Sequence, residues 1–149
     1  MNSLTNLARE VFSHDTYATH ISGVTIEDVT ITSAVCSLAI DSRHRNAKGS
    51  VMGGAIFTLA DLAAAIAANS HILAASESAD SVQLQWVSST ADIHFLNAAK
   101  GEKLSATASP VKKGRKMTVV STSISDNQGT LVAIVTTTFN TVSSPISNH

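Results

Sequence analysis

The sequence is poor in the residues that mark disulfide-bonded and metal-binding proteins. Its one cysteine, Cys36, excludes a disulfide within the chain. Cys36 stands in an apolar, strand-like stretch with no neighbour that would lower its pKa, so we expect a buried and unreactive thiol. The six histidines show no metal-binding spacing with one another or with the cysteine, and we predict neither a metal nor another cofactor.

A strong charge of either sign is also missing. Ten Lys and Arg stand against eleven Asp and Glu, which leaves a net charge of −1. A nucleic-acid-binding protein normally carries a basic excess, so this class is not indicated. Hydrophobic residues make up 44% of the chain and charged residues only 14%. This apolar balance suggests that another subunit covers part of the surface.

The chain lacks the features of a targeted or membrane-spanning protein. Its first residues have neither the basic nor the apolar region of a signal peptide. The most apolar stretch, Gly53 to Ala68, is short for a bilayer span and carries Asp61 at its centre. We expect a soluble, cytoplasmic protein. No repeat or linker divides it, so one domain is predicted over 1–149, with a lead-in over about 1–20 and a flexible tail over 143–149.

Apolar periodicity predicts two helices. Ser3 can cap a short helix over about 4–12, whereas residues 14–22 look irregular. Gly53-Gly54 opens a second helix that runs to about Asn69. After its start this helix contains no glycine or proline, and it is apolar nearly all round, which is typical of a buried helix.

The remaining regular segments are predicted to be strands. Residues 24–40 are rich in Val, Ile and Thr, and we expect two strands there with a bend near Glu27-Asp28. Four further candidates, joined by short connections, follow the second helix: 82–96, 103–111, 117–125 and 130–142. Short turns favour an antiparallel meander. One long helix against one antiparallel sheet makes an α+β domain.

Asp61 is the most informative single residue. It lies within the apolar helix, and that helix has no Lys or Arg to pair with it. Because burying an unpaired carboxylate is costly, a carboxylate kept in such a place is a candidate for function. The alternative is a structural Asp that hydroxyls or backbone groups of another strand or subunit satisfy.

The glycine pair at the start of the helix is the second candidate feature. The first N–H groups of a helix have no internal partner, and glycines let a ligand approach them, so they can polarise a carbonyl group. The alternative is an ordinary helix start. Gly54 and Asp61 share a face but lie about 10 Å apart along the axis, whereas reacting groups must approach to about 3–3.5 Å. Two antiparallel helices from two subunits could bring the glycine of one chain to the aspartate of the other.

The segment from Asn46 to Asp61, NAKGSVMGGAIFTLAD, resembles the signature of the PaaI-type hotdog thioesterases. That signature is Asn-x-x-Gly, then His-Gly-Gly, then a helix carrying Leu-Ala-Asp. The similarity continues through 90–96, 101–102, 114–115 and 126–133, and it covers about residues 15–141. The resemblance implies a hotdog fold, with a long central helix wrapped by an antiparallel sheet. It also implies dimers usually paired into tetramers, and hydrolysis of acyl-CoA thioesters.

The same resemblance assigns roles to individual residues. Asp61 matches the catalytic carboxylate, acting as a nucleophile or as a general base on water. Gly53, with Gly54 beside it, matches the position whose N–H polarises the thioester carbonyl. Asn46 matches the polar residue near the thioester and the leaving group. Ser88, or its neighbour Ser89, matches a hydroxyl that positions water, although a surface strand serine is an equal alternative.

Two positions depart from the family pattern, and one basic turn is open to two interpretations. Met52 stands where many members have His, and it can supply neither a proton nor a hydrogen bond. His94 stands where Asn is common, and we interpret it first as a strand residue. The basic turn around Gly114 could bind the phosphates of CoA through Arg115 and Lys113, or it could be an ordinary solvated hairpin.

Three other functions remain open at this level. A non-catalytic acyl-CoA-binding hotdog module would keep the glycines without needing Asp61. A hotdog dehydratase or hydratase generally needs a His, which Met52 replaces. A purely structural domain is the third. The sequence has no Gly-x-Ser-x-Gly motif, which argues against a serine hydrolase. It does not identify the acyl group.

Overall fold

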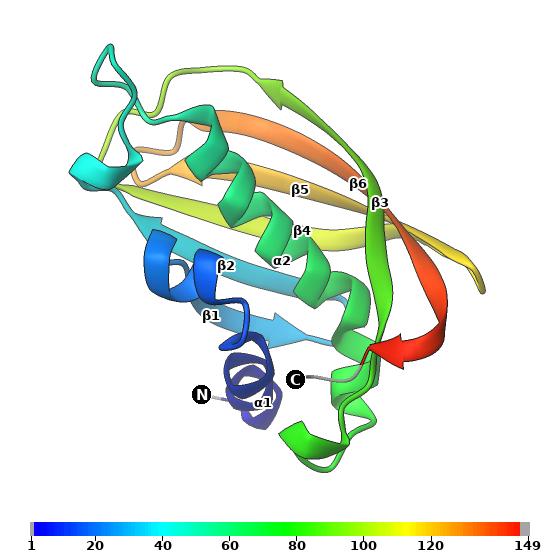
Figure 1. Ribbon diagram of the computed structural model, residues 1–149. Helices are drawn as coiled ribbons and strands as arrows, with labels where there is room; N and C mark the ends of the chain where they lie inside the picture. Colours follow the sequence, from blue (N-terminus) through cyan, green and yellow to red (C-terminus); the bar gives the residue numbers. More distant parts are fainter. Residues whose placement is uncertain (1, 147–149) are drawn as a thin grey trace.

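A computed structural model describes residues 2–146 (Figure 1). Within that range, six strands form one antiparallel sheet in the order β1-β2-β4-β5-β6-β3. The long helix α2 lies along the concave side of this sheet, and α1 lies beside β1. The predicted α+β architecture is therefore confirmed. The elements are α1 (Ser3–Phe12), η1 (Tyr17–Ser22), β1 (Thr25–Thr30), β2 (Ser33–Ala39), η2 (Ser42–His44), α2 (Gly53–Ala74), η3 (Ala79–Ser81), β3 (Leu84–Phe95), β4 (Lys103–Lys113), β5 (Met117–Asp126) and β6 (Leu131–Ile146).

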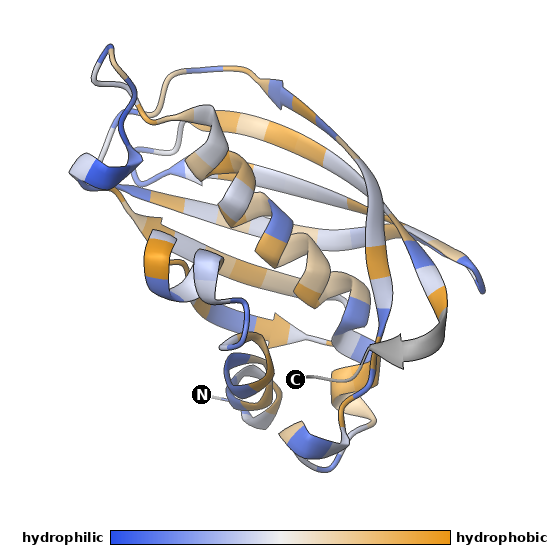
Figure 2. Cartoon of the chain, viewed as in Figure 1, coloured by the Kyte–Doolittle hydropathy of each residue, from blue (hydrophilic) through white to orange (hydrophobic). Residues whose placement is uncertain are grey.

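Small side chains set the spacing between α2 and the sheet. Five alanines of α2 are fully buried, and so are four alanines on the strands that face the helix. Figure 2 shows hydrophobic residues along most of α2 and along the strands behind it. Alanine lets the helix backbone approach the strands closely, while larger side chains such as Leu59, Ile66 and Leu73 fill the space along its flanks. The alanines are Ala60, Ala63, Ala64, Ala67 and Ala68 on α2 and Ala34, Ala106, Ala108 and Ala133 on the sheet.

The second half of α2 is joined to the sheet by polar side chains. The Asn69 side chain accepts hydrogen bonds from the backbone N–H groups of Gln85 and Trp86 (3.2 Å each) and donates to the Trp86 carbonyl (3.3 Å). The Ser70 hydroxyl donates to the Ile31 carbonyl (2.9 Å). The helix therefore does not end at Asn69 as predicted but continues to Ala74. Asn and Ser are weak helix formers by themselves, and here tertiary hydrogen bonds override that preference.

The two edges of the sheet differ. At β1, the Val29 N–H donates to the Thr5 hydroxyl (2.9 Å), and the Arg9 guanidinium donates to the Ile26 carbonyl (2.6 Å), so α1 covers this edge. At the opposite edge, β3 pairs only with β6 among the described strands. From Val87 to Phe95 every residue of β3 except Ile93 is exposed. One edge of the sheet is closed within the chain and the other is open.

The position of β3 corrects the predicted meander. Strands β4, β5 and β6 do follow one another as neighbours, but β3 lies beyond β6 and not beside β4. The connection over 96–102 therefore crosses from one edge of the sheet to its middle. The Asp126 carboxylate holds this connection by accepting a hydrogen bond from the Lys100 N–H (2.6 Å). Short loops alone do not determine which strands become neighbours.

The N-terminal part departs from the expectations in three details. The helix cap is Asn2, whose side chain accepts from the Thr5 N–H at 2.7 Å, rather than Ser3. The segment expected to be irregular contains a turn of π-helix, η1, which ends at Gly23 with φ 87°. The bend between the first two strands lies at residues 31–32, whereas position 27, where it was expected, is a bulge in β1.

The C-terminal part and the buried thiol can also be compared with the expectations. The last strand continues to Ile146, which pairs with Leu84, so residues 143–146 are part of the sheet. Residues 147–149 lie outside the described range. Cys36 is fully buried, as predicted, and burial raises the pKa of its thiol to about 12.

Among the described residues, α2 alone is long and apolar enough to cross a bilayer by length and composition. The helix has 22 residues, so the expectation that this stretch is too short for a span does not hold. However, 67% of its most apolar window is buried inside the molecule, as it is in the core helix of a folded domain. The helix belongs to the core because it packs against the sheet, although its length alone would also suit a bilayer span.

We predict that Asn69→Ala lowers the free energy of unfolding by about 2–3 kcal/mol, because it leaves buried backbone groups of β3 without a partner. Urea denaturation at one fixed protein concentration measures this loss. Asn6→Ala is the matched control, since Asn6 is exposed on α1. Equal stabilities of the two variants would show that Asn69 does not hold α2 to β3.

Candidate active site

Asp61 lies on the one side of α2 that the sheet leaves open. It belongs to a stripe with a spacing of three or four residues, Gly54, Thr58, Asp61 and Ala65, whose members are exposed or half-buried. Asp61 itself is exposed in the single chain, which corrects the expectation of a carboxylate buried in an all-apolar helix. The sheet can cover only one side of a helix, and the apolar stripe of α2 is wide but not complete.

The Asp61 carboxylate opens into a cavity of about 440 Å³. One wall is α2, and the other is the chain over 15–18, which comprises the end of the link from α1 and the first residues of η1. None of the described residues that line this cavity is Lys or Arg. Its lining residues are Asp15, Thr16, Tyr17, Ala18, Phe57, Thr58, Asp61, Leu62 and Ala65.

Both carboxyl groups in this cavity are harder to ionise than usual. Burial raises the pKa of Asp61, and the negative charge of Asp15 raises it further. Burial also raises the pKa of Asp15, and the nearby His14 partly offsets this. Although Asp61 is exposed as a residue, the cavity walls limit the water around its carboxylate. A carboxylate with a raised pKa is a stronger base, which suits proton abstraction or nucleophilic attack.

The two glycines of α2 open in different directions. Gly53 lines a cavity of about 410 Å³ between the start of α2 and residues 95–99, and a Cβ atom there would lie 2.9 Å from Phe95 Cζ. Gly54 lines another cavity, of about 290 Å³, together with Met52 and Tyr17. The N–H groups of Ala55 and Ile56 donate to the Met52 carbonyl, whereas those of Gly53 and Gly54 make no hydrogen bond with any described residue. These two N–H groups are available to a ligand.

A single chain does not bring the glycines to Asp61. Seven residues of helix separate Gly54 from Asp61, which is about 10 Å along the axis. Gly53, Gly54 and Asp61 line three different cavities, and none of these cavities is lined by both a glycine and Asp61. The separation predicted from the sequence is therefore present in the folded chain.

Asn46 has a local role in the loop before α2. Its side-chain oxygen accepts hydrogen bonds from the N–H groups of Lys48 (3.0 Å) and Ser50 (3.1 Å). The oxygen is thus occupied, and the NH₂ group is the part of this exposed side chain that remains to meet a substrate. Asn46 lies outside the Asp61 cavity.

The two serines of β3 can be told apart. Ser89 donates to the Thr138 carbonyl and to the Asn140 side chain, both at 3.1 Å. Ser88 is exposed and makes no hydrogen bond with a described residue, and its register partner is the buried Phe139. Because directly paired residues share a face, Ser88 points to the helix side of the sheet. Ser88 is therefore the better candidate for a hydroxyl that acts on a ligand.

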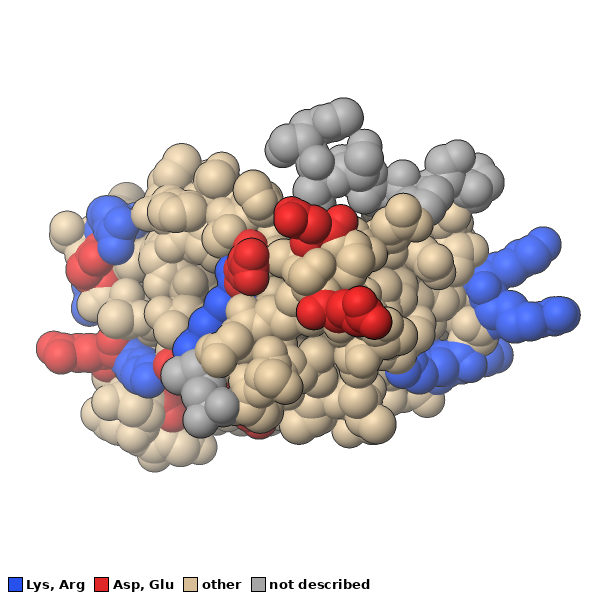
Figure 3. Space-filling view, turned by 90° about the horizontal axis from the view of Figure 1, so that it is seen from below, with Lys and Arg blue, Asp and Glu red and all other residues tan. Residues whose placement is uncertain are grey.

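The basic turn lies at the far end of α2 from the glycines. Figure 3 shows basic side chains projecting at one end of the molecule. Lys113, the last residue of β4, and Arg115, in the turn between β4 and β5, are both exposed. Burial is the larger cause of the lowered pKa of His71, and the positive charge of Lys113 is the second. The basic turn therefore lies near the last turn of α2. His71 is 18 residues beyond Gly53, about 27 Å along the helix.

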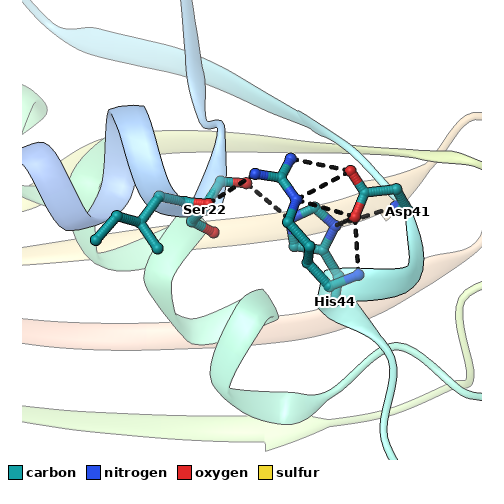
Figure 4. Close-up of polar contacts among 5 residues, drawn as sticks. Ser22, Asp41 and His44 are labelled. Atoms are coloured by element: carbon teal, nitrogen blue, oxygen red, sulfur yellow. Dashed lines mark hydrogen bonds and ion pairs between the residues drawn. The ribbon is translucent and has the colours of Figure 1, made fainter.

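A polar network fixes the chain that forms the wall opposite Asp61 (Figure 4). His44 is buried, its Nε2–H donates to the Ser22 carbonyl (2.7 Å), and its Nδ1 accepts from the Asp41 N–H (3.0 Å). Arg43 donates to the Asp41 carboxylate and to the Ile21 carbonyl, both at 2.9 Å. The end of η1 is thereby tied to the loop that leads into α2.

Comparison with known proteins identifies the family. A family model of the thioesterase superfamily matches residues 48–133 of the chain. The chain belongs to the thioesterase superfamily. The matched region contains Gly53, Asp61 and Ser88, together with the basic turn, whereas Asn46 lies just before it. No curated protein matches the sequence of this thioesterase-superfamily member.

Solved structures confirm the predicted hotdog fold. The PaaI protein of the E. coli phenylacetic acid degradation operon is 24% identical, with a TM-score of 0.72 over 96% of this chain and 99% of its own. A thioesterase family protein from Silicibacter pomeroyi is 21% identical, with a TM-score of 0.76 over 94% and 98%. A hypothetical thioesterase from Streptococcus pneumoniae, solved with coenzyme A, is 22% identical, with a TM-score of 0.71 over 90% and 96%.

Sequence reasoning missed the residues opposite Asp61 in this thioesterase fold. Asp15 and Tyr17 lie in a stretch without periodicity, and no spacing relates them to α2. His44 lies in the polar stretch 41–49, which has no apolar periodicity. His44 follows Asp41 by three residues, which is the spacing between a helix N-cap and the third residue of the helix. In the structure the two residues cap one another at the start of η2. This spacing is a signal that the sequence does contain.

We predict that His44→Ala lowers the free energy of unfolding by about 2–3 kcal/mol, since it removes a buried side chain and leaves the Ser22 carbonyl without its donor. Hydrogen exchange should accelerate at the backbone amides of η1. His71→Ala, at an exposed histidine, is the control. Unchanged exchange over residues 17–22 in the His44 variant would contradict the role of this network.

Proposed function

We propose that this chain hydrolyses acyl-CoA thioesters to the free acid and CoA, in the manner of the PaaI-type enzymes. The observation that carries the proposal is Asp61: a carboxylate with a raised pKa that opens into a cavity on the central helix of a thioesterase-superfamily domain. We place the protein in the cytoplasm, where acyl-CoA is available to it.

Hydrolysis needs a base or nucleophile on one side of the thioester and hydrogen-bond donors on the other. Asp61 attacks the carbonyl carbon itself or takes a proton from the water that attacks. The free N–H groups at Gly53 and Gly54 hydrogen-bond the carbonyl oxygen as it becomes negative. Collapse of the tetrahedral intermediate breaks the C–S bond, and CoA leaves as a thiolate that is then protonated. If water has attacked, this step releases the free acid directly. If Asp61 has attacked, the acyl group remains on Asp61 as a mixed anhydride, and water hydrolyses it to the free acid and restores the carboxylate. Met52 supplies neither a proton nor a hydrogen bond in any of these steps.

The site is proposed to lie between two subunits. Asp61 and the glycine N–H groups of one chain are too far apart to act on one carbonyl carbon. The open edge of β3, exposed on both faces, is the natural surface for a second copy, because α1 covers the other edge of the sheet. Antiparallel pairing of two copies sets the start of one α2 beside the middle of the other. We expect such dimers to pair into tetramers.

The same arrangement gives the basic turn a role. With the start of one α2 beside the middle of the other, the last turn of each helix extends beyond the first turn of its partner, so Lys113 and Arg115 of one chain lie beyond the glycines of the other. There they can bind the phosphates of CoA. The Asn46 amide and the Ser88 hydroxyl are then available to the leaving group and to water. The coenzyme A bound in the Streptococcus pneumoniae neighbour supports CoA as the ligand.

We predict that Asp61→Asn lowers kcat about 10²–10⁴-fold, because the amide can act neither as a base nor as a nucleophile. Thiol release from a panel of aryl and fatty acyl-CoAs, run on both proteins, measures the loss and identifies the acyl class. Acyl-CoA affinity should remain. Binding without turnover in the wild type would instead favour a non-catalytic acyl-CoA-binding module.

A second prediction tests the shared site. Gly53 is the first residue of α2 and follows an extended Met52, so the backbone there suits proline, which removes the N–H group and requires the Phe95 ring to shift. Gly53→Pro should lower kcat about 10²–10³-fold. In the control Gly53→Ala, the added Cβ atom contacts the same Phe95 ring, but the backbone N–H group is kept.

Co-expression of the Gly53→Pro and Asp61→Asn chains under two affinity tags gives a mixed dimer. One of its two sites then combines an intact glycine with an intact aspartate, so it should regain about half of the wild-type activity per dimer. An inactive mixed dimer would mean that each site is built from one chain.

A further inference from the structure

A second carboxylate, Asp15, lines the cavity into which Asp61 opens. Asp15 lies between α1 and η1, far from Asp61 in the sequence. Its backbone is fixed, because its N–H donates to the Phe12 carbonyl and its carbonyl accepts from the Thr19 N–H, both at 3.0 Å. The Asp15 carboxylate makes no hydrogen bond with a described residue. Its backbone therefore holds it near Asp61, and no hydrogen bond to a described residue stabilises its charge.

We propose that Asp15 is a positioning residue that acts through Asp61, by holding a second negative charge in the cavity and so making Asp61 a stronger base. This inference rests on the proposed function, in which Asp61 is the base or nucleophile. It goes beyond that function because it assigns a role to a residue outside the matched family region, on a segment that sequence analysis expected to be irregular.

Within one chain, few other groups could control Asp61. The titratable residues that line the cavity are Asp61 on α2 and Asp15 and Tyr17 on the opposite wall. No described residue of the sheet lines this cavity. His14 acts on Asp15 and partly offsets its raised pKa. Two like charges in a space with limited water each oppose ionisation of the other. Burial is the larger cause of the raised Asp61 pKa, and Asp15 is the second.

The sign of the effect follows from this coupling. In Asp15→Asn the second charge is gone, so the pKa of Asp61 falls toward the value that burial alone produces. The ionised fraction of Asp61 then persists to lower pH, and the acidic limb of the kcat/KM profile shifts to lower pH. At the same time the plateau activity falls, because a base with a lower pKa is weaker.

The experiment compares four proteins: wild type, Asp15→Asn, Asp15→Glu and Glu10→Gln. Asp15→Glu keeps the charge and should restore the wild-type profile. Glu10→Gln makes the same charge change at an exposed position of α1 outside the cavity and should not shift it. Thermal melting of each variant verifies that it is folded. A profile of Asp15→Asn that coincides with wild type would overturn the proposal.

Carbon-13 NMR titration of the Asp61 carboxyl group gives a readout that does not need turnover. Asp61 should titrate at lower pH in Asp15→Asn than in wild type and in Glu10→Gln. An unchanged Asp61 titration overturns the inference about Asp15, even if Asp61→Asn has already established the thioesterase reaction. Turnover that survives in Asp61→Asn instead overturns the proposed function, and the NMR titration still decides whether the two carboxylates are coupled.

Discussion

The close packing of α2 against the concave side of the sheet is the contact on which the rest of the molecule depends. Alanines on both surfaces bring the helix backbone near the strands, and the sheet consequently covers one side of the helix only. The uncovered stripe from Gly54 to Ala65 contains the one charged residue of the helix, Asp61. The same packing that forms the core therefore also decides which side chain of α2 remains accessible.

The wall that faces this stripe is contributed by a different part of the chain. The segment between α1 and η1 lies opposite Asp61 because His44 and Arg43 tie the end of η1 to the loop before α2. This loop also sets the start of α2 and with it the two free glycine N–H groups. One polar network thus positions both the wall opposite the candidate base and the loop that begins at the network and leads to the candidate hydrogen-bond donors.

The distance along α2 connects the architecture to assembly. Because a helix rises by about 1.5 Å per residue, its first turn and its middle cannot meet on one small reactive group. The sheet has one edge closed by α1 and one edge, β3, that is open and exposed on both faces. The same chain that separates the parts of the site therefore also presents a surface on which a second copy could complete it.

The sequence by itself determined the α+β class, the central helix from Gly53, most of the strands and the family, because these follow from local periodicity and from one contiguous motif. Tertiary structure alone decided that β3 lies beyond β6, that α2 continues past Asn69, that Asp61 is open to a cavity, and that Asp15 faces it. These features depend on contacts between residues far apart in the chain. Such contacts arise from register, side-chain volume and hydrogen bonds across elements, and local periodicity carries no record of them.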